Sequence, residues 1–184
     1  YLAHCLAEKS PAHISLHYTA LVAMFYAMLG VVLSDGGFSF LFFWELMTVA
    51  SFLLILFDAQ RREVRRAALS YLIMMHIGFV LLVIGFVRLD AACGAATFGA
   101  LGDYFRTQPG LPLLLVFLAG FGMKAGLFPM HVWLPEAHPA APSHVSALMS
   151  GVMIKTGVYG ILRVTAALGE QPLLHTAGVI LLAA

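Results

Sequence analysis

The sequence has 184 residues, of which 61% are hydrophobic and 10% charged, and its mean hydropathy is +0.94. Because an ordinary soluble domain has roughly 25% charged residues, this composition excludes that class and indicates an integral membrane protein. The formal net charge is +1 and no basic run is interleaved with aromatic residues, which argues against nucleic-acid binding. Cys5 and Cys93 lie far apart in the sequence and form no CxxC motif, so they predict neither a disulfide framework nor a metal site.

Apolar windows long enough for a membrane-spanning helix, about 20 residues, follow one another along the chain. The first covers about 14–33 and ends at the turn sequence SDGG, and the second covers about 38–57 and contains Glu45. After the sequence DAQRREVRR, a third window at about 67–87 contains His76. These windows predict three helices joined by two short connections.

The second half of the chain continues the pattern with one interruption. A polar, glycine-rich stretch at 88–110 precedes a fourth window at about 111–128, which holds Lys124 among three glycines. The prolines of the following HVWLPEAHPAAPSH sequence forbid a continuous helix. A fifth window covers about 143–164, and a sixth at about 173–184 is cut short. We therefore predict an all-α polytopic bundle with five complete spans and a truncated sixth, the fourth span being broken near Lys124.

An arginine cluster predicts the orientation of this bundle. The connection between the second and third windows carries Arg61, Arg62, Arg65 and Arg66. The positive-inside rule places this connection in the cytoplasm. Alternation of the spans then puts the 88–110 stretch outside and the HVWLPEAHPAAPSH sequence inside.

Three charged residues lie within predicted spans: Glu45, Lys124 and Lys155. An ammonium near the bilayer centre costs about 2.5–3.5 kcal/mol on the insertion scale, and such residues usually face a protein interior or a wet cavity. The three glycines around Lys124 and the following Pro129 weaken the helix there. Since broken helices at membrane depth line cavities and recur at ion sites in transporters, this lysine is a candidate functional site.

The ionisable residues suggest a proton relay. A lysine has a pKa of about 10.4 in water, which burial lowers and a nearby carboxylate raises. Movement of Glu45 toward or away from Lys124 would therefore switch the lysine between holding a proton and passing it toward Lys155. Histidines suit the intermediate positions because their unperturbed pKa is about 6.5. Three of them lie between the two lysines: His131, His138 and His144.

Helix geometry adds further expectations. On a regular helix, the eleven residues from His144 to Lys155 return to within about 20° of one face. A separate stripe of small residues predicts close helix packing, and it consists of Ser146, Ser150, Gly157 and Gly160.

His76 is a further candidate for the relay, and Glu136 is an interfacial residue that could gate water entry.

The run from Lys124 to Arg163, KAGLFPMHVWLPEAHPAAPSHVSALMSGVMIKTGVYGILR, resembles the signature segment of the proton-conducting, antiporter-like membrane subunits. That family includes the large membrane-arm subunits of respiratory complex I (NADH:quinone oxidoreductase), multisubunit sodium/proton antiporters and subunits of group 4 membrane-bound hydrogenases. The APSHVSALMSGVMIKTGVYGILR and FFWELM sequences are most similar to the large membrane subunit of hydrogenase-4 and formate hydrogenlyase.

The resemblance implies two inverted repeats with broken helices at corresponding positions, and residues 1–184 would hold most of the first repeat. We expect the chain to be an excised piece, since it starts without a methionine and ends within an apolar run. By motif, Glu45, Lys124 and Lys155 match the charged residues on the family's fifth, seventh and eighth helices. The three histidines match its inner-side segment: His131 and His138 lie in HxWLPxAH, and His144 follows the AP pair.

The implied function is proton translocation across the inner (cytoplasmic) membrane, with other membrane subunits and peripheral redox subunits as partners. No flavin, iron–sulfur or nickel ligand pattern is present in the sequence, so we expect no cofactor or metal site in this chain.

Two alternatives remain open at this point. One is a structural membrane subunit whose buried ions only hold helices together, and the other is a membrane redox enzyme with His76 and His144 as axial haem ligands. Protons are favoured over sodium because hard cations prefer several oxygen ligands, and Glu45 is the only carboxylate in the predicted spans.

Overall fold

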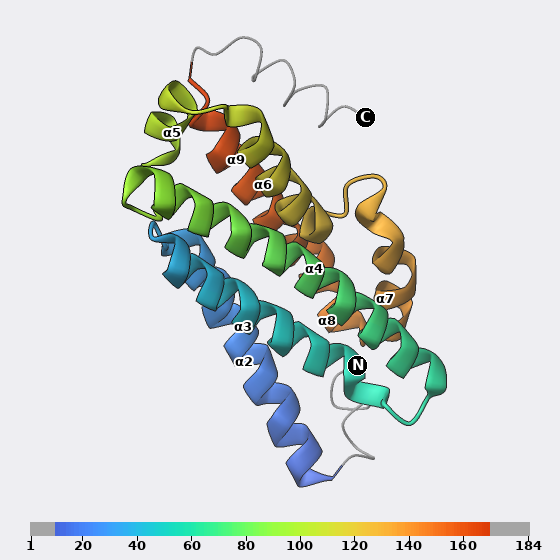
Figure 1. Ribbon diagram of the computed structural model, residues 1–184. Helices are drawn as coiled ribbons and strands as arrows, with labels where there is room; N and C mark the ends of the chain where they lie inside the picture. The colour runs from blue at the N-terminus through green and yellow to red at the C-terminus, as the bar shows by residue number, and fades with distance from the viewer. Residues whose placement is uncertain (1–9, 170–184) are drawn as a thin grey trace.

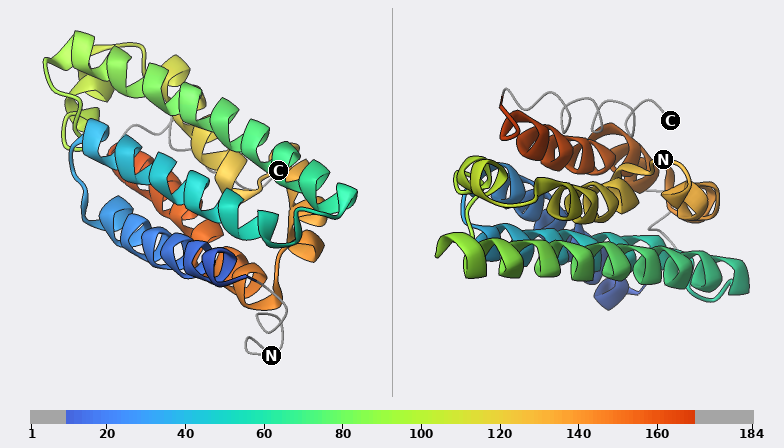
Figure 2. Two further views of the ribbon diagram at one scale, coloured as in Figure 1. Left: turned by 90° about the horizontal axis from the view of Figure 1, so that it is seen from below. Right: turned by 45° about the horizontal axis from the view of Figure 1, so that its top comes forward.

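The computed structural model describes residues 10–169, and all regular elements in that range are helical. Five of these helical segments are long and apolar enough to cross a membrane. The long helices lie lengthwise beside one another (Figures 1 and 2). The predicted all-α polytopic bundle is confirmed, whereas the predicted span at 173–184 lies outside the described residues.

The first two helices form an antiparallel pair. α2 (Pro11–Leu33) begins with a proline in its first turn, where a missing backbone N–H costs nothing, and Ser10 caps it by accepting a hydrogen bond from the backbone N–H of His13. The SDGG sequence turns the chain into α3 (Gly37–Ile55), which a short 3-10 turn, η1 (Leu56–Asp58), extends. These bounds match the first two predicted windows within a few residues.

The third helix is much longer than predicted. α4 (Arg62–Cys93) has 32 residues against the 67–87 window, and Gly94 ends it in a left-handed conformation with φ of 70°. A membrane-spanning helix needs to be apolar only in its central part, and Arg and Glu are good helix formers, so both polar ends continue the helix. The arginine cluster consequently lies mostly on the first turns of α4 rather than in a loop. The stretch predicted as polar and glycine-rich also contains a short helix, α5 (Leu101–Thr107).

The predicted break near Lys124 is present. α6 (Gly110–Ala125) stops at Gly126, which adopts a left-handed φ of 70° that glycine tolerates without strain. The backbone N–H groups of Gly126 and Leu127 both donate to the carbonyl of Gly122. The indole N–H of Trp133 donates to the carbonyl of Met123 at 2.9 Å, so this carbonyl at the helix end has a partner.

The proline-rich segment folds into two short helical pieces. A 3-10 turn, η2 (Met130–Trp133), leads into α7 (Leu134–Ala140), which tolerates Pro135 because it lies in the first turn. The helix ends before Pro142, since a residue that precedes proline disfavours the helical conformation. The prolines therefore prevent a continuous helix, as predicted, but permit a short one.

The last described span is interrupted in its middle. α8 (Ser143–Leu148) passes into a π-helical turn, η3 (Met149–Met153), and then into α9 (Ile154–Ala166). Two glycines of the predicted small-residue stripe hold α9 against α6: a Cβ atom at Gly157 would lie 2.6 Å from the backbone nitrogen of Ala125, and one at Gly160 would meet the ring of Phe121. Small residues of this kind let helix backbones approach closely. Ser150, by contrast, is exposed.

Candidate functional site

Lys124 lies inside the bundle, at the last turn of α6. Its side chain is 1% exposed, and Nζ donates a hydrogen bond of 2.8 Å to Oγ1 of Thr48 on α3. The ring of Trp44, one turn earlier on α3, lies 4.5 Å from Nζ, within the range of a cation–π interaction. The lysine is thus enclosed between α3 and α6 and does not face lipid.

The hydrogen bond from Lys124 to Thr48 is compatible with both protonation states of the amine. The Thr48 hydroxyl donates its own hydrogen to the carbonyl of Trp44 at 3.1 Å, so its oxygen can only accept from Lys124. An ammonium has three N–H donors and a neutral amine has two, so either form can make this bond. A group that keeps its anchor in both states is suited to take up and release a proton.

Glu45 pairs with His76 rather than with Lys124. Oε1 of Glu45 lies 3.0 Å from Nε2 of His76 on α4, so the expected contact between Glu45 and Lys124 is not formed. The cause is the rotation of α3, which turns Thr48 toward α6 and Glu45 toward α4. Glu45 and Thr48 are nevertheless three residues apart, so their side chains are neighbours on adjacent turns of α3. The Glu45–His76 pair and the Lys124–Thr48 hydrogen bond are therefore neighbours on α3.

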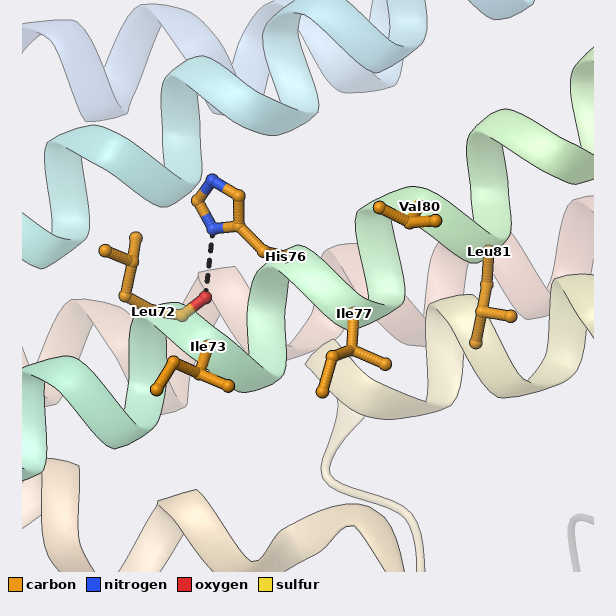
Figure 3. Close-up of a pocket in the computed structure, with 6 residues that line it drawn as sticks. All are labelled: Leu72, Ile73, His76, Ile77, Val80 and Leu81. Atoms are coloured by element: carbon orange, nitrogen blue, oxygen red, sulfur yellow. Dashed lines mark hydrogen bonds between the residues drawn. The ribbon is translucent and has the colours of Figure 1, made fainter.

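The hydrogen bonds of His76 fix the number of protons in this pair. Figure 3 shows the ring reaching from α4 toward α3, with Nδ1 at 3.0 Å from the carbonyl of Leu72. A carbonyl can only accept, so Nδ1 carries a hydrogen. The second ring nitrogen meets a carboxylate, and this contact needs a proton on either His76 or Glu45. The pair therefore holds one shared proton, as an ion pair or as two neutral groups.

The Glu45–His76 pair lies at the outer surface of the described helices. The His76 side chain is 48% exposed and that of Glu45 is 24% exposed. Beside His76 runs an apolar groove along α4 (Figure 3), lined by Leu72, Ile73, Ile77, Val80 and Leu81. Oε2 of Glu45 is buried and has no hydrogen-bond partner within residues 10–169.

Two of the predicted histidines lie on the segment between the helix break and α8. Nδ1 of His138 lies 2.9 Å from the hydroxyl of Ser146, and its ring stacks on Trp133, which caps the end of α6. His131 stacks on Phe128, and its buried Nδ1 has no hydrogen-bond partner in the described part of the chain.

The third predicted histidine, His144, makes a contact that the sequence analysis missed. Its Nε2 atom lies 2.8 Å from Nε2 of His17, a buried residue of α2. The haem alternative required His76 and His144 to bind one group, but each has its own partner: a glutamate on α3 for His76 and a histidine on α2 for His144.

Lys155 is placed very differently from Lys124. It is exposed among the described residues, and its Nζ donates to the carbonyl of Ser150 in the π-helical turn of its own span at 2.9 Å. A π-helical turn takes up an additional residue, which rotates everything after it by about 100°. The calculation that put His144 and Lys155 on one face assumed a regular helix and is therefore wrong.

Glu136 is exposed, as expected for an interfacial residue. It lies with arginines of the cluster along a polar groove between α7 and the start of α4, lined in part by Arg61, Glu63 and Arg66.

Sequence reasoning missed three residues of these sites: Thr48, Trp44 and His17. Two signals were available. Thr48 follows Glu45 by three residues and shares its helix face, and a histidine such as His17 within an apolar span is itself a candidate functional residue.

Comparison with known proteins identifies the family. Residues 34–183 match the family described as "NADH:quinone oxidoreductase/Mrp antiporter, TM". Hydrogenase-4 component B of Escherichia coli (strain K12) is 41% identical over 143 residues, which cover 75% of this chain and 20% of that protein. The chain thus spans about a fifth of the length of the curated relatives it matches.

Solved structures show the same relationship. A chain of the membrane-bound sulfane sulfur reductase, an archaeal respiratory membrane complex, matches with a TM-score of 0.73 and 30% identity, covering 82% of this chain and 25% of that one. The Mrp complex from Dietzia sp. DQ12-45-1b gives a TM-score of 0.77 and 26% identity over 85% of this chain and 18% of the other. This chain therefore belongs to the family of antiporter-like transmembrane subunits that occur in multisubunit membrane complexes.

Proposed function

We propose that this chain translocates protons across the inner membrane as part of an antiporter-like subunit of a redox complex, of the hydrogenase-4/formate hydrogenlyase or NADH:quinone oxidoreductase type. Its neighbours would be other membrane subunits and peripheral redox subunits, which would supply the redox chemistry. The arginine-rich start of α4 would face the cytoplasm. The proposed relay consists of Glu45, Lys124, Lys155, His131, His138 and His144, with His76 joining it through Glu45.

The observation that carries this proposal is the enclosure of Lys124 at a broken helix. Burying an ionisable group costs free energy that an apolar residue would not cost, and a structural role would favour a fixed charge with several partners. Within residues 10–169, Lys124 instead has a single hydrogen-bond partner, Thr48, which accepts from the amine in either protonation state. One turn away, the Glu45–His76 pair holds a proton that either group can carry.

A structural, non-conducting subunit is the second candidate, and a specific observation supports it. The Glu45–His76 pair joins α3 to α4, and the bond from Lys124 to Thr48 joins α6 to α3. These contacts would hold the helices together whether or not a proton moves. Removing the charge of Lys124 without disturbing the packing should therefore stop proton pumping in a proton-translocating subunit and leave it unchanged in a structural one.

The substitution Lys124→Met, made in the complete protein within its native complex, distinguishes the proton-translocating function from the structural one. Methionine fills a similar volume without a proton-binding group, so we expect assembly and melting temperature to be retained. Proton pumping by reconstituted vesicles, measured as dye quenching per assembled complex, should fall about 100-fold or more, the effect typical of losing a positioned proton-transfer group.

The matched control is Phe117→Leu, which alters buried packing on the same helix, seven residues before Lys124 and against the rings of Phe86 and Phe121. This variant should lower the melting temperature and leave pumping per assembled complex unchanged. Normal pumping by assembled Lys124→Met complexes would instead favour the structural subunit.

A further inference from the structure

Two histidines from distant parts of the sequence meet near one end of the bundle. The rings of His17 and His144 have centroids 5.0 Å apart at an interplanar angle of 75°, with the two Nε2 atoms 2.8 Å apart. His17 lies in the second turn of α2 and His144 in the first turn of α8. Resting on the proposed function, we infer that the His17–His144 pair is a proton-exchange site, which brings α2 into the proton pathway.

The short Nε2–Nε2 distance determines how protons are distributed. One Nε2 must carry a hydrogen and the other must offer its lone pair, because two bare nitrogens or two N–H groups would repel at 2.8 Å. The pair can therefore be neutral or carry one extra proton, but it cannot hold both rings as hydrogen-bonded imidazolium ions. A single exchangeable charge is the capacity that a relay position requires.

This arrangement can pass a proton without breaking the hydrogen bond. A proton that arrives at Nδ1 of the donor ring makes that ring cationic, and its Nε2 proton then moves to Nε2 of the acceptor ring. The second ring releases its own Nδ1 proton and becomes neutral. One proton has entered and one has left, both rings have exchanged tautomers, and the hydrogen bond now runs in the opposite direction. Reorientation or tautomerisation of the rings restores the starting state.

The His17–His144 pair has both an apolar ring and ionisable side chains around it. His17 is 4% exposed, and the ring of Phe57, at the end of α3, packs edge-on against both His17 and His13. Among the described residues, two ionisable side chains lie beside this site: His13, one turn earlier on α2 and against the same Phe57 ring, and Tyr18, whose ring centroid lies 6.0 Å from that of His17. An apolar ring on one side and ionisable neighbours on the other favour a group that is desolvated and yet within reach of protons.

The pair also lies close to the relay along α8. Ser146, two residues after His144, contacts His138 on α7, whose ring stacks on Trp133. The indole of Trp133 in turn bonds to the carbonyl preceding Lys124. Because a stacked ring passes no proton, water would be needed at that step, whereas the exchange between His17 and His144 is direct.

The test replaces His17 by glutamine in the complete protein within its native complex. A glutamine amide can still donate to or accept from His144 but cannot bind an additional proton. A pair that only joins α2 to α8 would tolerate this change. We expect assembly to be retained and proton flux in reconstituted vesicles to fall by about 10-fold or more.

Three variants serve as comparison. Tyr26→Phe changes an exposed ionisable side chain about two and a half turns further along α2, and it should pump as the wild type does. His144→Gln should cause a loss similar to that of His17→Gln, and the double variant should be no worse than either single one, since both remove the same exchange step. If the His17→Gln complex fails to assemble, the proton flux of the His144→Gln complex tests whether the histidine pair exchanges protons.

The outcomes separate this inference from the proposed function. Normal flux in the glutamine variants, with pumping lost in Lys124→Met, overturns the role of the histidine pair and leaves the proposed function standing. A wild-type complex that moves no protons overturns both.

Discussion

The two lysines of the proposed relay occupy opposite kinds of environment. Lys124 is enclosed between two helices, bonded to a threonine on α3 and facing an indole ring. Lys155 is exposed within the described residues and bonded only to the carbonyl of Ser150 in its own span. Both lie next to a departure from regular α-helix: Lys124 precedes the break at the end of α6, and Lys155 follows the π-helical turn η3. The same residue type is thus fixed by tertiary contacts at one site and by local backbone at the other.

Because the two lysines are held differently, different helices determine the position of each one. The contacts of Lys124 with Thr48 and Trp44 depend on how α3 and α6 are packed, so changes in either helix should alter them. The position of Lys155 depends on the π-helical turn and on the close contact that holds α9 against α6 through Gly157. Substitutions that change the contacts of one lysine and leave those of the other intact test whether the two are held in different ways.

The largest effect on stability is expected from Gly157→Val. Its side chain would overlap the backbone of Ala125 and the carbonyl of Phe121, neither of which can move aside cheaply. Overpacking of this kind should lower the free energy of unfolding by about 3 kcal/mol, measured by denaturant titration of the complete protein in detergent. Gly151→Ala is the control, because a Cβ there meets nothing within 4 Å. A stable Gly157→Val protein would show that α9 is not anchored through this contact.

A smaller effect is expected from Thr48→Val, which keeps the shape of the side chain but removes the acceptor for Lys124. Leaving a buried amine without its partner should cost about 2 kcal/mol of unfolding free energy and should also reduce proton flux. Thr156→Val is matched to it, because the hydroxyl of this buried threonine bonds to the carbonyl of Met153 in its own span and lies 3.8 Å from the sulfur of Met47 on α3, so its loss leaves no amine without a partner. Equal losses in the two variants would mean that the Thr48 bond has no special part in holding Lys124.

The smallest effect on stability is expected from Lys155→Met. Substitution of an exposed side chain that bonds only to its own span should change the free energy of unfolding by no more than about 0.5 kcal/mol. Its proton flux should nevertheless fall if Lys155 belongs to the relay, so stability and flux need to be measured on the same preparation. A large loss of stability would place Lys155 in a structural contact, contrary to the contrast drawn with Lys124.

Much of the fold was predictable because the signals are local. Apolar windows located the five described spans, and three glycines with Pro129 located the break near Lys124. The ends of α4 were not predicted, since hydropathy marks the part of a helix that lies in lipid and not the part that projects from it. The π-helical turn was also missed, because its sequence, MSGVM, contains no proline and only one glycine.

The candidate site was predicted by residue but not by partner. Lys124, Glu45 and the histidines were selected because ionisable groups are costly in an apolar span. In the structure Glu45 contacts His76 and Lys124 contacts Thr48, and the switch based on movement of Glu45 toward or away from Lys124 stays a prediction. The inverted-repeat organisation inferred from the family resemblance stays a prediction.

The sequence by itself determined that the chain crosses the membrane as helices, where one helix breaks and which side chains are too polar to face lipid. These properties depend on the composition of short segments and on backbone chemistry. Only the tertiary structure decided which of those side chains meet: Lys124 with Thr48, Glu45 with His76, and His17 with His144. The physical reason is that lipid is as apolar as the helix interfaces, so hydrophobic periodicity does not reveal which face of a helix is buried, and the rotation of each helix is set by close packing.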